Sequence, residues 1–114
     1  MKILFRVDSY PEIAIGHLAR CINLGKTLEE LGNQITIISY KDSETQARLN
    51  NSGLKFYLLD HKINNKDFIR LEKSLISKYK VDADLLIVDS YKVDSKYFNE
   101  MKFLYPVVVY LDDL

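Results

Sequence analysis

Five short runs of apolar residues punctuate the chain, and each is too short to form a helix of ordinary length. The runs occupy positions 3–8, 35–38, 55–59, 85–88 and 107–111, of which 55–59 is the weakest. Consecutive apolar residues over such lengths are typical of strands that are buried on both faces of a parallel sheet. We therefore expect five strands.

Between these runs, apolar residues recur every three or four positions, which is typical of helices with one buried face. In the first such segment the apolar residues are Leu18, Cys21, Ile22, Leu28 and Leu31. Gly32 can end this helix because glycine adopts the left-handed conformation without strain. The same spacing predicts helices over 68–79 and 97–104, the latter with Asp94 as its N-cap.

The segment 43–51 has a weaker apolar pattern, but Ser43 can cap it and Gly53 can end it, so we expect a short helix there. Strands and helices then alternate along the whole chain. This order predicts an α/β fold, with a Rossmann-like, doubly wound, five-stranded parallel sheet and helices on both faces. We expect residues 1–114 to form a single domain.

Composition narrows the classes of partner. The chain has 114 residues, 47% of them apolar, which is enough for one domain with its own core. Sixteen basic and sixteen acidic residues cancel, so we expect neither nucleic acid nor a membrane surface as a partner. A lone cysteine, no leader and no apolar run of membrane-spanning length favour a cytoplasmic location.

Polar side chains follow each predicted strand, at the edge where a doubly wound sheet binds its ligands. The strands end in Asp8-Ser9, Ser39-Tyr40, Asp60-His61, Asp89-Ser90-Tyr91 and Asp112-Asp113. The carboxyl edge of the sheet is therefore expected to be polar and rich in carboxylates.

The loop after the first strand leads into Gly16 and His17, at the start of the first helix. Gly16 permits close backbone approach, and the helix N-terminus can face an oxygen-rich ligand. The positive helix end favours the neutral imidazole, so His17 is either a general base or a solvated capping residue. Asp8 can orient this histidine or bind a sugar hydroxyl. Arg20, one turn further, can hold a carboxylate or phosphate or pair with Asp8.

Several familiar signatures are missing. A Gly-Lys-Thr tripeptide at 25–27 resembles the end of a P-loop, but Arg20 stands where the upstream glycine is required, and the tripeptide lies inside a predicted helix. No dinucleotide-binding glycine motif follows the first strand, and no nucleophile elbow is present. Because His17, Cys21 and His61 lack metal-ligand spacing, we expect no metal and no other cofactor.

Three segments share the order of a known family. They read Arg6-Val7-Asp8-Ser9 with Ile13-Ala14-Ile15-Gly16-His17 and Arg20, then Leu86-Ile87-Val88-Asp89-Ser90-Tyr91, then Leu111-Asp112-Asp113. They resemble the PseG and SpsG family, the UDP-sugar hydrolases of pseudaminic acid biosynthesis and their spore-coat polysaccharide relatives. The family's first motif is approximately R-x-D-x-x-x-x-I-G-x-G-H-x-x-R, in which Ala14 here replaces the first glycine.

The resemblance implies a GT-B-like architecture with a nucleotide-sugar between two Rossmann-like domains. This chain would be the N-terminal, sugar-side domain, without the C-terminal domain that binds UDP. The isolated domain is then expected to be inactive. The family removes UDP from a diacetamido-trideoxy sugar without a metal, and the histidine matching His17 activates water. The resemblance and the strand-end positions together assign substrate binding to Asp8, Ser9, Gly16, Arg20, Tyr91 and Asp112.

Two alternatives remain open at the level of sequence. The chain can be the acceptor-binding half of a GT-B glycosyltransferase, in which His17 deprotonates a hydroxyl group. It can also be a receiver-like binding module without catalysis, with Asp60 as the phosphoacceptor. The receiver pattern is incomplete, because no second carboxylate follows Asp8 and no lysine follows the last strand.

Overall fold

The structure is a computed structural model that describes residues 1–8, 15–60, 67–90 and 93–111. The strands are β1 (Lys2–Val7), β2 (Gln34–Tyr40), β3 (Lys55–Leu59), β4 (Leu85–Asp89) and β5 (Val107–Tyr110), and the helices are α1 (Ile15–Glu30), α2 (Ser43–Ser52), α3 (Phe68–Tyr79) and α4 (Ser95–Lys102). The five strands form one parallel sheet in the order β3-β2-β1-β4-β5. The predicted doubly wound, Rossmann-like α/β fold is therefore confirmed.

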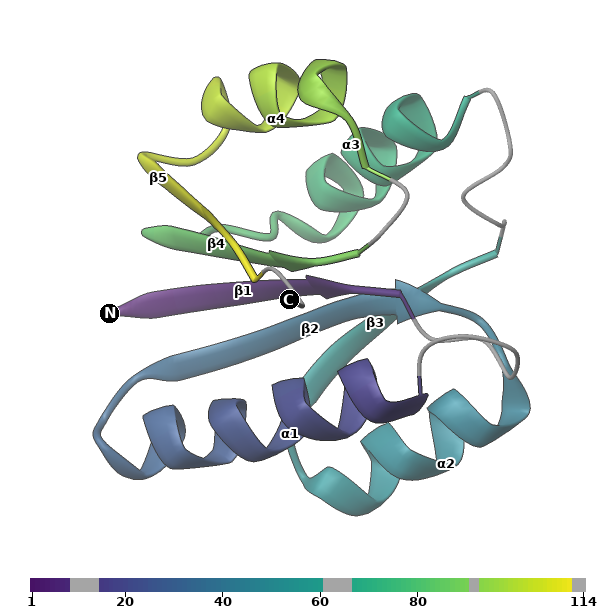
Figure 1. The fold of residues 1–114 in the computed structure, drawn as a ribbon, viewed down its shortest axis with the longest axis vertical. Coiled ribbons are helices and arrows are strands. Elements are labelled where there is room, and N and C mark those ends of the chain that lie inside the picture. The colour runs from purple at the N-terminus through teal and green to yellow at the C-terminus, as the bar shows by residue number, and fades with distance from the viewer. Residues whose placement is uncertain (9–14, 61–66, 91–92, 112–114) are drawn as a thin grey trace.

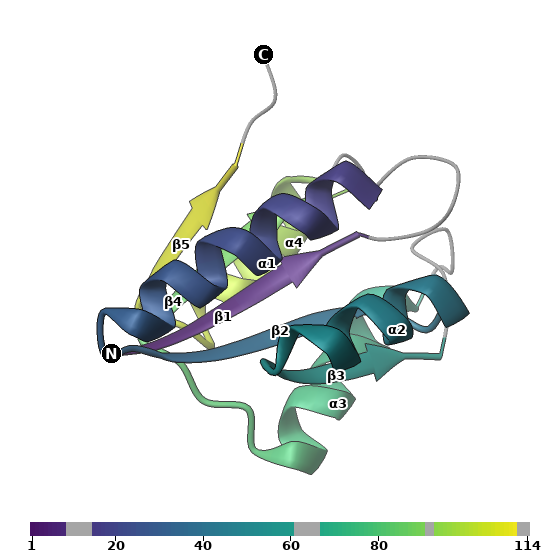
Figure 2. The ribbon, with the colours of Figure 1, turned by 90° about the horizontal axis from the view of Figure 1, so that it is seen from below.

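Helices cover the sheet on both sides. Helices α1 and α2 lie against one face, and α3 and α4 lie against the other (Figures 1 and 2). The residues of β1 alternate between the two layers: Phe5 and Val7 belong to the core under α1 and α2, whereas Leu4 belongs to the core under α3 and α4. This alternation also decides which strand-end side chains can meet. No helix of the described residues is long and apolar enough to cross a membrane.

The helix ends follow the local rules with one correction. Gly32 and Gly53 have φ values of 97° and 75°, the left-handed conformation expected of them, and Asp94 caps α4 by accepting a hydrogen bond from the Tyr97 amide at 3.0 Å. The prediction that Ser43 caps α2 is wrong. Asp42 is the N-cap and accepts from the Thr45 amide at 3.2 Å, because its carboxylate reaches the free amides better from one position earlier.

Two strand ends differ from the sequence prediction in a way that matters for the site. Strand β4 extends to Asp89, one residue beyond the apolar run, and Asp89 pairs in register with Val7 of β1. Strand β1 itself ends at Val7 rather than at Asp8. The two aspartates therefore lie beside each other at the carboxyl edge, and the Asp8 amide donates to the Asp89 carbonyl at 3.2 Å.

Strand β5 is an edge strand with an exposed apolar surface. It pairs with β4, and Val107, Val109 and Tyr110 are each more than a third exposed. Phe103, in the turn before it, is 88% exposed. Such a surface contrasts with β1, whose residues from Ile3 to Val7 are all buried.

Candidate functional site

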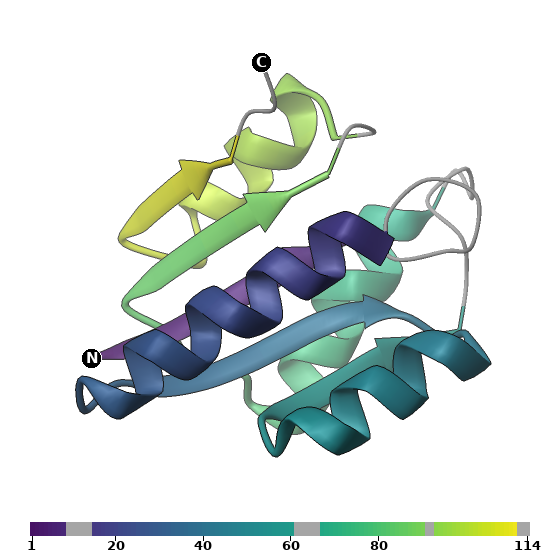
Figure 3. The same ribbon diagram turned by 60° about the horizontal axis from the view of Figure 1, so that its bottom comes forward.

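The candidate site lies where the strand order reverses. Chain order runs outward from β1 in both directions, so the crevice that such sheets use for ligands falls between the carboxyl ends of β1 and β4. Figure 3 shows the first turn of α1 at this same end, beside the arrowheads of the strands. Helix α1 thus brings its N-terminal side chains to the place where β1 and β4 end, beside Asp8 and Asp89.

His17 is held by a buried carboxylate. Its Nδ1 lies 2.6 Å from Oδ1 of Asp89, a side chain that is only 1% exposed. When Nδ1–H donates to Asp89, the acceptor lone pair of the neutral ring is on Nε2. A carboxylate that fixes the tautomer and orientation of a histidine is an arrangement that supports general-base catalysis, as in Ser-His-Asp triads.

Two further side chains of α1 converge on the same carboxylate. Arg20 donates to Asp89 through Nε at 2.8 Å and through Nη2 at 2.9 Å, and Cys21 Sγ lies 3.4 Å from Oδ2. These residues and His17 are spaced three and four apart, so they share one face of the helix. Asp89 therefore ties the first turns of α1 to the end of β4.

Cys21 contributes a hydrogen bond rather than a nucleophile. Burial, and then the charge of Asp89, raise the pKa of its thiol far above the usual range, so the thiolate does not form near neutral pH. Within the ranges that the structure describes, no three His, Cys, Asp or Glu side chains are grouped so that they could hold a metal ion.

A second buried network lies on the opposite face of the sheet. The Arg6 guanidinium is fully buried, with Nε 3.0 Å from Oε1 of Glu72, which also accepts a hydrogen bond from the Tyr97 hydroxyl at 2.8 Å. The guanidinium carbon lies 4.6 Å from the centre of the Tyr40 ring, a cation–π contact. Burial alone would lower the pKa of Arg6, but the opposing charge of Glu72 raises it overall, so Arg6 stays charged.

Asp8 ends this second network. Arg6 Nη1 lies 3.4 Å from its Oδ1, and the Ser90 hydroxyl donates to its Oδ2. The Ser90 carbonyl in turn accepts from the Tyr110 hydroxyl of β5 at 3.0 Å. Burial raises the pKa of Asp8 above its usual range, although Arg6 and Ser90 act in the other direction.

The structure assigns the contacts of the predicted residues differently from the sequence alternatives. Asp89, rather than Asp8, orients His17, and Arg20 pairs with Asp89 rather than with Asp8. The physical reason is the pleat of the sheet, because Asp8 follows Val7 and turns toward the opposite face from it.

Several predicted residues remain to be placed. Ser9, Tyr91 and Asp112 lie outside the described residues, as does Ala14. Gly16 is exposed, and a Cβ built there meets no atom within 4 Å, so packing among the described residues does not require glycine at this position. Asp60, the phosphoacceptor of the receiver alternative, has an 81% exposed side chain beside Lys41.

The site also contains residues that sequence reasoning did not assign to it. Asp89 and Ser90 appeared at a strand end and in a family motif but were assigned no role, and Arg6 and Glu72 received none either. A signal existed for the last two. Arg6 is a charged residue inside an otherwise apolar strand, and Glu72 falls four residues after Phe68 on the apolar face of its helix. Charged residues at apolar positions are an indication of a buried ion pair.

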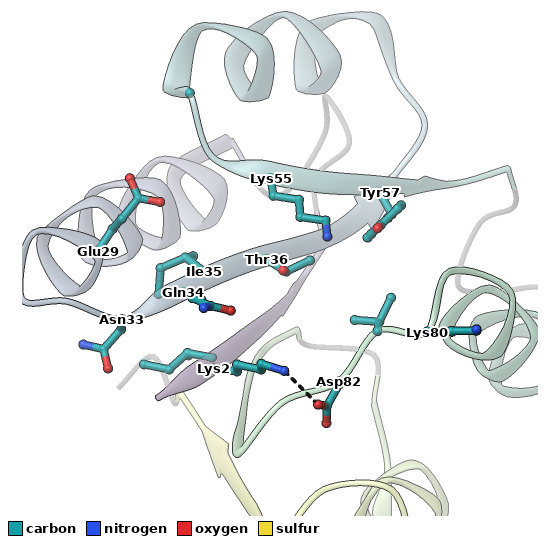
Figure 4. A pocket seen from close by; sticks show the side chains of 13 residues that line it. Lys2, Glu29, Asn33, Gln34, Ile35, Thr36, Lys55, Tyr57, Lys80 and Asp82 are labelled. Carbon is teal, nitrogen blue, oxygen red and sulfur yellow. Dashed lines mark hydrogen bonds and ion pairs between the residues drawn. The ribbon is translucent and has the colours of Figure 1, made fainter.

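A hollow at the opposite, amino edge of the sheet has a different character. It encloses about 560 Å³ near the starts of β1, β2 and β3. Figure 4 shows Lys2, Lys55 and Tyr57 around it, with Lys2 paired to Asp82 at 3.1 Å. The Lys2 and Asp82 side chains are 50% and 75% exposed, so their charges are largely solvated.

Comparison with known proteins supports the fold. No family model matches this sequence, and no curated protein matches it. The structure is similar to that of a glycosyltransferase from Rickettsia africae ESF-5, with a TM-score of 0.66 and 18% sequence identity. The similarity covers 99% of this chain and 31% of the glycosyltransferase, so the chain spans less than a third of that protein. At this identity, the comparison shows that the chain has the Rossmann-like α/β fold of a domain found in a glycosyltransferase.

Proposed function

We propose that residues 1–114 are the sugar-side domain of an enzyme that hydrolyses a UDP-linked diacetamido-trideoxy sugar, in the biosynthesis of pseudaminic acid or of a spore-coat or other surface polysaccharide. The observation that carries this proposal is the 2.6 Å contact between His17 Nδ1 and Asp89 Oδ1 at the point where the strand order reverses. The motif around Arg6, Asp8, His17 and Arg20 supports the choice of sugar hydrolase.

The reaction follows from the orientation of His17. Its Nε2 accepts a proton from water while the water oxygen bonds to the anomeric carbon. The bond between that carbon and the UDP oxygen breaks, and UDP leaves with the electron pair. Asp89 and the imidazolium then form an ion pair, which stabilises the charge that develops on His17. UDP is an adequate leaving group, so this mechanism does not need the strong general acid of an ordinary glycosidase.

A GT-B-like enzyme of this kind would bind UDP with a second Rossmann-like domain facing the carboxyl edge of this one. The similarity to the Rickettsia glycosyltransferase supports such an arrangement only at the level of the fold, since this chain corresponds to 31% of that protein. In the proposal, this chain supplies the base and the sugar-contacting edge.

The same similarity favours a second candidate function. In a GT-B glycosyltransferase, His17 would take the proton from an acceptor hydroxyl instead of water, and that oxygen would bond to the anomeric carbon. The proton transfer and the leaving group are otherwise the same. The two functions therefore share His17 and Asp89 and differ in the nucleophile.

His17→Asn is the most informative variant. The asparagine amide can still donate to Asp89 from about the position of Nδ1, but it has no basic nitrogen at the position of Nε2. In the polypeptide that carries residues 1–114, UDP release from the diacetamido-trideoxy sugar nucleotide should fall by about 10²–10⁴-fold in kcat. The free energy of unfolding should stay near that of the wild type.

His17→Gln is the matched control for shape, since it fills the ring position without a base, and it should be equally inactive. Turnover by His17→Asn at the wild-type rate would refute the mechanism. Reaction in H₂¹⁸O separates the two candidates, because hydrolysis places the label on the anomeric carbon, whereas a transferase releases UDP only when an acceptor sugar is added.

A further inference from the structure

Exposed apolar side chains are concentrated in strand β5 and in the turn before it. Among the described residues nine large apolar side chains are exposed, and five of them lie within residues 103–110. These five are Phe103, Leu104, Val107, Val109 and Tyr110, with exposed fractions between 40% and 88%. The segment 103–111 also contains no charged residue, although 28% of the chain is charged. Exposed apolar surface that is gathered in one place is typical of a protein–protein contact.

The two edge strands of the sheet, β3 and β5, differ in how they are protected. In β3, Lys55 carries a charge, and the other four residues are buried or half-buried. In β5, Val107 and Val109 pair with Leu85 and Ile87, which belong to the core under α1, so all four side chains lie on the α1 face. Figure 3 shows α1 passing over β1, whereas no helix of the described residues covers β5 (yellow) on this face. Natural edge strands usually avoid such an exposed, uncharged surface.

The backbone of β5 is oriented to pair with another strand. The Leu111 amide donates to the Val88 carbonyl of β4 at 2.9 Å. Because backbone groups alternate in direction along a strand, the Val109 amide also points toward β4. The amides and carbonyls of Val108 and Tyr110 then point the other way, out of the sheet. Within the described residues, β5 is the last strand on this side.

We propose that β5 pairs with the β5 of a second copy of this chain, antiparallel and across a twofold axis that passes through Val109. In this register, Val108 of each copy lies opposite Tyr110 of the other, and each such pair exchanges both of its backbone hydrogen bonds. On the α1 face, Val109 meets its own copy and Val107 lies opposite Leu111. The two sheets then form one continuous sheet.

The second copy is the favoured occupant because this strand is complementary to itself. The proposed register pairs valine with tyrosine and valine with leucine, which are stabilising cross-strand pairs, and no charge meets a like charge. An axis through Val108 would place Tyr110 opposite Pro106, which has no N–H for the Tyr110 carbonyl. Since β5 has four residues, the interface is small, and we expect a dissociation constant on the order of 10 μM.

Sedimentation velocity tests the proposal in the polypeptide that carries residues 1–114. Between about 1 and 200 μM, the wild type should show an equilibrium of monomer and dimer. Val109→Lys places two ammonium groups opposite each other on the axis, so the dissociation constant should rise by about 100-fold or more. Tyr79→Lys is the matched control, because Tyr79 is 46% exposed but stacks on Tyr57 of β3, at the opposite side of the sheet. This control should change the dissociation constant less than about twofold.

A mixture of Val109→Lys and Val109→Glu separates loss of pairing from loss of folding. Because each Val109 lies opposite its own copy, the two variants should form a mixed dimer at least about tenfold tighter than either variant alone. Amide exchange gives a second measurement. The Val108 amide should exchange more slowly as the wild-type concentration rises, and the Val109 amide, which points toward β4, should change less.

Three results would overturn the proposal. The first is a wild-type polypeptide that stays monomeric over the whole range, which would leave β5 to another segment or another protein. The second is a dimer that Val109→Lys does not weaken, or that Tyr79→Lys weakens equally, since its interface would lie elsewhere. The third is the absence of a preferred mixed dimer, which excludes an axis through Val109. None of these results depends on the proposed hydrolase activity.

Discussion

The two edges of the sheet treat charge in opposite ways. At the carboxyl edge, Arg6, Asp8 and Asp89 are 0%, 4% and 1% exposed. Arg6 contacts Asp8, and Asp89 is bound by Arg20. At the amino edge, the hollow of about 560 Å³ is bordered by Lys2 and Asp82, which are half exposed or more. The proposed function places the chemistry at the carboxyl edge, away from this hollow. Buried charge, which a fold retains only at a cost in stability, indicates the functional edge better.

The difference follows from how a parallel sheet is wound. Every strand ends at the carboxyl edge, and the first turn of α1 starts there, so side chains from several elements converge in one place. The amino edge gathers the helix ends at Gly32 and Lys80, and both residues are exposed. The following variants test this contrast.

Arg6→Met should have the largest effect on stability. It leaves Glu72 and Asp8 as buried carboxylates without their cation, a change that typically costs about 3–5 kcal/mol in the free energy of unfolding. The amino-edge counterpart, Lys2→Met, removes a solvated ion pair and should cost less than about 1 kcal/mol. Urea unfolding of both variants measures the contrast, and equal losses would remove it.

Asp89→Asn should have the next largest effect. The variant keeps the shape of the side chain but leaves Arg20 and His17 without a charged acceptor, at a cost of about 1–3 kcal/mol. Asp84→Asn is its amino-edge match, because Asp84 accepts from the Lys2 amide at 2.8 Å in an exposed position. It should cost about 1 kcal/mol or less. Thermal and urea unfolding should agree on the order of the two variants.

The tyrosines of the second network should make the fold sensitive to alkali. Burial, and then the charge of Glu72, raise the pKa of Tyr97 well above 10.0, and burial raises that of Tyr40 despite the nearby Arg6. An acid with a raised pKa in the folded state stabilises the fold below its unfolded pKa, and this contribution is lost as the pH rises above about 10. The urea midpoint should therefore fall above pH 10, and less steeply in Tyr97→Phe. The same slope in both proteins would contradict this account.

Asp8→Asn should have the smallest effect on stability. The folded-state pKa of Asp8 is raised above 3.8, so its contribution to stability is complete below pH 3.8 and is lost as the pH rises through the folded pKa. The asparagine variant lacks this loss. Its free energy of unfolding, relative to the wild type, should therefore increase between pH 3.5 and pH 7. A decrease over that range would mean that Arg6 needs Asp8 more than the burial of Asp8 costs.

Sequence alone predicted the elements well because each carried its own signal. The strand at 55–59 and the helix at 68–79 have the predicted bounds, and their alternation with the other elements was enough for the doubly wound sheet. The edge of the site was predicted for the same reason. The sequence did not predict which aspartate faces His17. Successive strand residues point to opposite faces, and the predicted strand ends differed from the observed ones by one residue. The register of Val7 with Asp89 settles it.

The buried ion pairs were missed for a different reason. Apolar patterns predict a core of apolar side chains. Arg6 and Glu72 break that pattern in two different elements, at positions that are 66 apart in the sequence. Each is an isolated exception in the sequence, but the structure places Arg6 Nε 3.0 Å from Glu72 Oε1. The exceptions were informative only as a pair.

The central position of β1 also has a consequence for the order of folding. The Ser90 hydroxyl and Asp8 are separated by 82 residues, whereas β1 reaches β2 through a single helix. Closing the longer loop costs more chain entropy and delays the pairing of β1 with β4. The β1-β2-β3 half can therefore be assembled before Asp89 meets His17, and pulse-labelled amide exchange should protect β2 before β4. In that sequence of events, the contact between Asp89 and His17 forms only after half of the sheet has assembled.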